Sequence, residues 1–266
     1  MKLTLLGTGN AGATACYNTC FVLNDGENFF LVDGGGGNTV LRQLKEVGID
    51  TNEIHDIFVT HKHIDHLLGI IWIVRMITSA MGNGKYVGDA RIYGHDEVLS
   101  LIREFAGKLL LEKEAGFLDN RLHLIEVRDG DRLDVIGHRT AFFDIGSTKA
   151  KQFGFMMEIG NGEKLTCCGD EPFSEREREY AQNSKWLLHE AFCLYEDRER
   201  FRPYQKHHST VKDACELAEQ LKVQNLLLYH TEDTDLTNRK FRYTEEGKTF
   251  FHGNLFVPDD LETIEL

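Results

Sequence analysis

A dense cluster of histidine and aspartate is the sequence feature that most constrains this chain. Residues 60–66 read Thr-His-Lys-His-Ile-Asp-His and directly follow an apolar run that is typical of a buried strand. His61 and His63 are two positions apart, so an extended backbone points both side chains the same way. Asp65 and His66 then fall at the turn into a following helix. Three imidazoles and a carboxylate are ligands that zinc prefers, so the cluster predicts a metal site.

A solvated polar loop is the alternative interpretation of residues 61–66. It would bring several polar groups to the end of a buried strand, where burial costs free energy, without a function for them. We therefore favour the metal site. Zinc is the expected ion, with manganese or iron as alternatives.

Length and composition are those of an ordinary globular domain. The chain has 266 residues, of which 41% are hydrophobic and 27% are charged. That is enough for one large core, so we expect a single domain over 1–266. The formal net charge of −13 repels polyanions and argues against a broad nucleic-acid-binding surface, although a local basic pocket could still hold one phosphate.

The cysteines and the apolar segments favour a cytoplasmic protein that does not cross a membrane. The six cysteines contain no CxxC pair, and a core of this size needs no disulfides, so we expect reduced thiols. The first apolar residues are too few for a secretion signal. The longest apolar stretch, around 67–77, is interrupted by Arg75 and is shorter than a membrane span.

Strand and helix patterns alternate along the whole chain. Strands are expected at 2–6, 17–23, 29–33, 54–60, 90–93, 186–190 and 225–229, and helices at 38–47, 67–81, 97–111, 174–182 and 210–221. Short strands dominate residues 122–168. Grouped strands with helices before and after them suit two sheets packed face to face with helices outside, which is a four-layer αββα sandwich of the α/β (α+β) class.

The histidine run resembles the HxHxDH signature of the metallo-β-lactamase superfamily, and five further motifs agree with it. They are Leu6-Gly7-Thr8-Gly9, Asp33-Gly34-Gly35, Cys168-Gly169-Asp170, His208-Ser209-Thr210 and Tyr229-His230-Thr231. The first and the fourth are similar to motifs of the ribonuclease Z branch. The resemblance covers essentially the whole chain and implies the metallo-β-lactamase fold, a metal-dependent hydrolase and, in this branch, phosphodiesterase activity.

The resemblance also implies a role for each matching residue. It assigns the first metal ion to His61 and His63, the second to Asp65, His66 and His230, and a bridging position to Asp170. Asp33 would orient the metal-binding loop. His208 would donate a proton to the leaving group, oriented by Glu190, so that Asp65, His208 and Glu190 form the expected catalytic set. His207 in place of His208, and an ordinary ion pair for Glu190, remain open alternatives.

One departure from the family concerns the first metal ion. The family supplies a third histidine from the loop after the middle strands, and here Gly146 occupies that place. His138 is no easy substitute, because eight residues of extended strand put it about 26 Å away. Either the first site has a weak or open ligand set, or another group such as Asp144 fills it. One or two bound ions are therefore both compatible with the sequence.

A second departure concerns the substrate. Transfer-RNA-processing members carry a long inserted arm, in many of them between the third histidine and the bridging aspartate. Here a plain hairpin fills the 24 residues from Gly146 to Asp170. We therefore expect a small-molecule or short nucleotide phosphodiester as substrate, although relatives with the arm elsewhere keep tRNA open. Lys149 and Lys151 could steer a phosphate, and a solvated basic pair is the alternative.

Other functions fit the sequence less well. The GxGxxG pattern at 7–12 is followed by a strand rather than the helix that dinucleotide binding needs, and a GxSxG elbow is absent. The main rival is a non-catalytic or regulatory metal-binding member with an impaired first site, favoured by Gly146. A redox member with iron ranks last, because no flavin-binding domain accompanies it. The relatives make a homodimer the default expectation.

Overall fold

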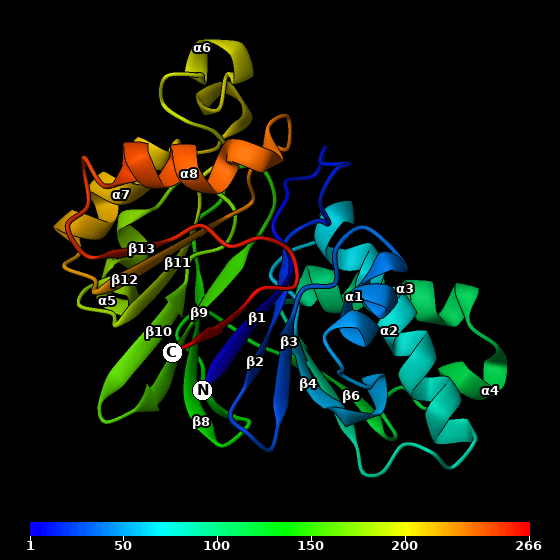
Figure 1. The fold of residues 1–266 in the computed structure, drawn as a ribbon. Helices are drawn as coiled ribbons and strands as arrows, with labels where there is room; N and C mark the ends of the chain where they lie inside the picture. The colour runs from blue at the N-terminus through cyan, green and yellow to red at the C-terminus, as the bar shows by residue number, and fades with distance from the viewer. The chain divides into compact units, whose positions relative to one another are not determined.

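The chain folds into two compact units, each built on one seven-stranded sheet. The computed structural model describes all 266 residues. The first unit comprises Met1–Gly7, Asn18–Arg128 and Leu261–Leu266, and the second comprises Thr8–Tyr17 and Asp129–Asp260. Figure 1 shows each sheet with the helices of its own unit. The single domain expected over the whole chain stays a prediction.

The first unit contains a mixed sheet with the strand order β14-β1-β2-β3-β4-β5-β6. Its strands are β1 (Lys2–Gly7), β2 (Cys20–Asn24), β3 (Phe29–Val32), β4 (Ile54–Phe58), β5 (Ala90–Gly94), β6 (Leu122–Glu126) and β14 (Thr263–Glu265). The pairings from β14 to β3 are antiparallel, and those from β3 to β6 are parallel. The last strand of the chain thus pairs with the first, and the hydroxyls of Thr4 and Thr263 lie 2.9 Å apart.

The helices of the first unit are α1 (Thr39–Glu46), η1 (Thr51–Glu53), α2 (Ile64–Gly82), α3 (Asp96–Leu109) and α4 (Glu112–Ala115). The loop after β3 lies directly on α2. The backbone N–H of Gly69 donates to the carbonyl of Gly35 at 2.9 Å, and a Cβ on Gly69 would lie 1.7 Å from the carbonyl oxygen of Gly34. Only glycine allows this approach, which brings the loop after β3 against the first turns of α2.

Helix α2 is longer than the apolar stretch that the sequence suggested. It has 19 residues and is apolar enough to cross a membrane by length and composition alone. The expectation that the longest apolar stretch is shorter than a membrane span was therefore wrong. However, 56% of its most apolar 18-residue window is buried in the structure, and its first turn carries the buried polar residues Asp65 and His66. We interpret α2 as a core helix. All six cysteines are free thiols, as expected, and cytoplasmic localisation stays a prediction.

The second unit repeats the strand-pairing pattern of the first. Its sheet has the order β13-β12-β11-β10-β9-β8-β7. The strands are β7 (Arg132–Val135), β8 (His138–Asp144), β9 (Phe153–Gly160), β10 (Glu163–Cys167), β11 (Trp186–Glu190), β12 (Asn225–Tyr229) and β13 (Asn254–Phe256). The pairings from β7 to β10 are antiparallel and those from β10 to β13 are parallel, so each sheet joins an antiparallel half to a parallel half.

The helices of the second unit are η2 (Glu175–Glu177), α5 (Arg178–Ala181), α6 (Arg198–Phe201), η3 (Tyr204–Lys206), α7 (Val211–Gln220) and α8 (Leu236–Gly247). Helices α7 and α8 lie together over the parallel strands (Figure 1). Helix α8 was not expected, because it is mostly polar. It buries only Arg239, Tyr243 and Gly247, a narrow stripe of residues four positions apart.

The parallel halves of the two sheets position the candidate site residues. In the first unit, Asp33 follows β3 and the histidine run follows β4. In the second, Asp170 follows β10, Glu190 ends β11 and His230 follows β12. Neighbouring parallel strands end at the same edge of a sheet, so each unit gathers its own set of polar side chains at one edge.

Candidate metal centre

The loop after β4 brings its histidines together as the spacing predicted. His61, Asp65 and His66 are all buried, with at most 4% of their surface exposed. The ring centroid of His61 lies 4.4 Å from that of His63 and 4.2 Å from that of His66. Three imidazoles therefore converge within the first unit, and the expectation that His61 and His63 point the same way is confirmed.

Asp33 orients this loop. Its carboxylate accepts hydrogen bonds from the backbone N–H of Thr60 at 2.9 Å, from the Thr60 hydroxyl at 2.8 Å and from Nδ1 of His66 at 2.7 Å. Because Nδ1 of His66 is held by the carboxylate, its Nε2 is the ring atom turned toward a ligand, 3.4 Å from Oδ2 of Asp65. The backbone of Asp33 is left-handed, with φ of 58°, a conformation that functional sites often hold.

The hydroxyl of Thr60 sets the tautomer of His61. Its single proton goes to Asp33, so toward His61 it can only accept, from Nδ1 at 2.9 Å. Nε2 of His61 then carries the lone pair, and it lies 2.8 Å from Nδ1 of His63. Asp33 and Thr60 thus set His66 and His61 in the tautomer whose Nε2 carries the lone pair, and a metal ion binds an imidazole through such a lone pair.

Asp170 and His230 form the corresponding pair in the second unit. Both are buried, and Oδ2 of Asp170 lies 3.4 Å from Nε2 of His230. The other carboxylate oxygen accepts a hydrogen bond of 2.5 Å from Nε2 of Gln152. Only glycine fits at position 169, because the backbone there has a φ of +77° and a Cβ would lie 2.7 Å from Nε2 of Gln152. Sequence reasoning missed Gln152, which belongs to no motif and reaches Asp170 only through the fold.

His208 and Glu190 also come together. Nδ1 of His208 lies 3.6 Å from Oε2 of the fully buried Glu190, whose other oxygen accepts from the backbone N–H of Ser209. The ring of His208 stacks on Phe192 and lies 5.2 Å from that of His230. Burial of the ring opposes its protonation, but the carboxylate of Glu190 and the charge of Asp170 outweigh this and raise the pKa of His208.

His207, the alternative to His208, lies in a different setting. It is exposed, its backbone is left-handed, and its ring nitrogen lies 3.4 Å from the hydroxyl of Thr148. No carboxylate is paired with it. The geometry therefore favours His208.

The loop after β8 has no histidine at the expected place. Gly146 has a φ of +77°, and a Cβ there would lie 3.2 Å from Cδ of Arg176. The carboxylate of Asp144 accepts from the backbone N–H of Gly146 at 2.8 Å and so closes the turn. His138 lies at the other end of β8, where it contacts the carbonyl of Glu158. The family's third histidine thus has no counterpart in this loop.

Residues 1–252 match the family described as anti-Pycsar protein Apyc1. The match spans the histidine run and every motif that follows it, through the last candidate ligand. This chain belongs to the Apyc1 family. The function of this Apyc1-family member therefore depends on the candidate metal ligands that it retains and on the histidine that Gly146 replaces.

Curated relatives and solved structures place this Apyc1-family chain in the ribonuclease Z-like branch of the metallo-β-lactamase superfamily. Ribonuclease Z of Thermococcus sibiricus is 24% identical and is matched over 100% of this chain and 96% of its own length. The metallo-β-lactamase fold protein YhfI of Bacillus subtilis has a TM-score of 0.80 at 19% identity. Human tRNase Z, short form, has a TM-score of 0.76 at 20% identity. In both structures the match covers 100% of this chain and 99% of the other.

These comparisons confirm two expectations from the sequence. The resemblance to the metallo-β-lactamase superfamily is correct, and so is the α/β sandwich of that fold. Members of this fold depend on metal ions, and PqqB of Methylobacterium extorquens, with a TM-score of 0.76 at 12% identity and full coverage of both chains, is described as Zn²⁺-bound. The imidazole and carboxylate groups described above fit that chemistry.

Proposed function

We propose that this chain is a metal-dependent phosphodiesterase. The observation that carries the proposal is a pair of hydrogen-bonded branches from Asp33, one through Thr60 to His61 and one directly to His66, which fix the tautomers that a metal ion needs. A purely structural loop has no need of such an arrangement of buried imidazoles. The names of its relatives, ribonuclease Z and a diphosphatase of the PhnP family, support hydrolysis at phosphorus.

The family resemblance leads us to assign the ligands in two groups. One contains His61, His63 and Asp170, and the other contains Asp65, His66 and His230, with Asp170 bridging. Imidazole and carboxylate ligands suit zinc, and manganese or iron remain alternatives. The first group lacks the third histidine, so it is the weaker site and one firmly held ion is the minimum. A bound ion supplies Lewis-acid stabilisation of the phosphate charge.

The catalytic residues of the proposal are Asp65, His208 and Glu190. His208 donates a proton to the oxygen of the leaving group, since the carboxylate of Glu190 raises its pKa and so favours the protonated ring. Glu190 is buried behind it and stabilises the imidazolium. Asp65 lies beside Nε2 of His66 and orients the attacking group.

The substrate class follows from what the second unit contains. Strands β9 and β10 form a plain hairpin, so no arm that could grip a tRNA lies between Gly146 and Asp170. The net charge of −13 also disfavours a long polyanion. A small-molecule or short nucleotide phosphodiester therefore fits best. A regulatory metal-binding protein is the second candidate, favoured only by Gly146, and the retained pair of His208 and Glu190 argues against it.

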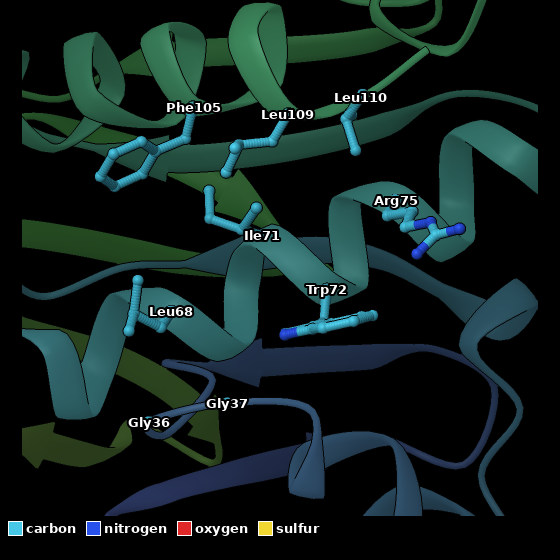
Figure 2. A pocket seen from close by; sticks show the side chains of 9 residues that line it. All are labelled: Gly36, Gly37, Leu68, Ile71, Trp72, Arg75, Phe105, Leu109 and Leu110. Atoms are coloured by element: carbon cyan, nitrogen blue, oxygen red, sulfur yellow. The ribbon is translucent and has the colours of Figure 1, made fainter.

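We propose a homodimer that forms through helix α2. Its large apolar side chains Ile64, Leu68, Trp72 and Met76 recur every four residues and are 36–69% exposed. In Figure 2, Leu68 and Trp72 line one side of a groove of about 280 Å³, and side chains from the end of α3 line the other. Two copies of charge −13 repel each other overall, so a surface with few acidic groups favours their contact, and a stripe of this kind can pack on its own two-fold copy.

Light scattering after size-exclusion chromatography tests the dimer. Trp72→Glu should give a monomer, because it places a charge at the centre of the stripe. Phe241→Glu is the matched control, since Phe241 is 69% exposed on α8, and it should leave the dimer intact. A monomeric wild type would contradict the proposal.

Elemental analysis and a simple hydrolysis assay test the enzymatic function. Protein purified without chelator should contain one to two zinc or manganese ions per chain and should hydrolyse bis(p-nitrophenyl) phosphate. Asp170→Asn should lose both metal and activity, because it removes the charge of the proposed bridging ligand. Asp144→Asn tests whether Asp144 completes the first site, and it should then lose only one ion. A metal-free, inactive wild type would overturn the proposal and favour the regulatory candidate.

A further inference from the structure

The loop that lacks the third histidine is firmly attached to the segment that carries Asp170. The hydroxyl oxygen of Ser147 accepts from the backbone N–H groups of Lys149 and Ala150, both at 3.2 Å. The same hydroxyl donates to Oε1 of Glu171 at 2.8 Å. Glu171 is buried and directly follows Asp170. The loop is therefore held in one place beside a proposed metal ligand, although it contributes no histidine of its own.

This attachment places the ammonium group of Lys149 between two segments of the candidate site. Nζ donates to the carbonyl of Lys206 at 3.1 Å, just before His207 and His208 in the chain. It also lies 3.5 Å from Oε1 of Glu171. The side chain remains 28% exposed, so a ligand can reach it.

The ammonium group retains hydrogen-bonding capacity in this position. It has three N–H donors, and the carbonyl of Lys206 takes one of them. The 3.5 Å separation from Glu171 exceeds the usual length of a hydrogen bond, so the carboxylate holds the cation mainly by charge. Lys149 can therefore donate to a further anionic oxygen without giving up either of its present contacts.

We propose that Lys149 binds a non-bridging oxygen of the substrate phosphate and supplies positive charge on the side where the third histidine is missing. The inference rests on the phosphodiesterase proposed above and names a residue for its substrate contact. A first metal site with an incomplete ligand set binds its ion less tightly, so less positive charge is held there to neutralise the phosphate. A positioned ammonium group can stabilise the same charge, because a cation aimed at a phosphoryl group interacts more strongly where water is partly excluded.

A structural ion pair is the competing explanation. Glu171 is a buried carboxylate, and such a group needs a cationic partner. In that case Lys149 would only neutralise Glu171, and its loss would destabilise the fold without changing phosphate binding. Phosphate affinity, metal content and stability must therefore be measured separately on the same variants.

The experiment uses the zinc-loaded full chain and inorganic phosphate as the probe. Phosphate binding is measured directly by calorimetry and also as inhibition of bis(p-nitrophenyl) phosphate hydrolysis. Lys149→Met should weaken phosphate binding about ten- to a hundredfold, the range of a hydrogen bond to a charged group. Lys149→Arg should retain most of the affinity. Lys248→Met removes one exposed charge elsewhere in the second unit and should bind phosphate like the wild type.

The outcomes separate this inference from the proposed function. Weaker phosphate binding in Lys149→Met, with unchanged zinc content and rescue by Lys149→Arg, supports the phosphate contact. Unchanged phosphate affinity overturns it, as does a loss of zinc in folded Lys149→Met that accounts for the weaker binding. If Lys149→Met does not fold, Lys149→Arg and Lys149→Gln are compared in the same way. A wild type that binds phosphate but hydrolyses no diester would contradict the proposed function while leaving the phosphate contact intact.

Discussion

Arg239 donates a hydrogen bond of 2.9 Å from Nη1 to the hydroxyl of Thr231, the residue that follows His230. The same nitrogen donates to the hydroxyl of Thr8 at 3.0 Å. Thr231 is held further by its backbone, since its N–H donates to the carbonyl of Thr8 and its own carbonyl accepts from Asn10. His230 has a φ of 58°, so these contacts stabilise the strained residue that presents its imidazole.

We therefore expect Arg239→Met to lose metal. The variant leaves the hydroxyls of Thr8 and Thr231 without their buried donor, which should destabilise the fold by about 1–3 kcal/mol and release His230. Metal per chain and urea unfolding measure the two effects. Arg242→Met is the control, because Arg242 makes only ion pairs near the surface of α8, and it should cost about 1 kcal/mol or less. Full metal content in Arg239→Met would show that Thr231 does not position His230.

Asp33→Asn should weaken metal binding about ten- to a hundredfold. Asparagine keeps the shape of the side chain but loses the negative charge that holds Nδ1–H of His66. Competition with a chromophoric zinc chelator measures the affinity. Asp56→Asn is the matched control, since Asp56 is also buried in the first unit but pairs with Tyr93 and Arg91. Equal zinc affinity in wild type and Asp33→Asn would show that Asp33 does not contribute to zinc binding.

The motifs that sequence analysis could interpret are those whose contacts are set by strand ends. The histidine run, Asp33, Asp170 and His230 each follow a strand of a parallel half, so their order along the chain already implied which edge they occupy. Spacing by two within one loop was enough to bring His61 and His63 into contact. For these residues a local pattern carries the information.

The remaining features depend on contacts between distant parts of the chain. Gln152 reaches Asp170, and Arg239 reaches Thr8 across 231 positions, and no local pattern marks either residue. Helix α8 escaped prediction because its apolar periodicity is weak and the stripe it buries begins with an arginine and ends with a glycine. The pairing of β14 with β1 joins the two ends of the chain and has no sequence signature.

Glu177 should make the stability of the protein depend on pH. The segment 174–182, expected to be one helix, begins as η2, and the carboxylate of Glu177 accepts from the backbone N–H of Ser174 at 2.7 Å. Burial, partly offset by hydrogen bonds from Ser174 and Cys168, raises the pKa of Glu177 from 4.5 to about 8. Its other oxygen is buried without a hydrogen-bond partner. The folded protein therefore holds this proton more tightly than the unfolded chain does.

The sign of the effect follows from that raised pKa. The contribution of Glu177 to stability is complete below pH 4.5 and is lost as pH rises through about 8, with a slope of up to about 1.4 kcal/mol per pH unit. Glu177→Gln keeps a neutral side chain at every pH, so the difference in unfolding free energy between variant and wild type should grow in favour of the variant from pH 5 to 8. Urea unfolding at several pH values measures it, and parallel curves for the two proteins would contradict the assignment.

Restoring the family's histidine with Gly146→His should not restore a complete first site. The backbone of Gly146 has a φ of +77°, where a side chain costs about 1–2 kcal/mol, and a Cβ would lie 3.2 Å from Arg176. We expect lower stability and no gain in metal per chain. Gly146→Ala is the control for the backbone cost, and it should be destabilised to a similar extent. The same loop holds Lys149 against Glu171, so a shift in its backbone should also weaken phosphate binding. A second metal ion bound by Gly146→His but not by Gly146→Ala would show that the loop can accept the histidine and that its loss left the site otherwise intact.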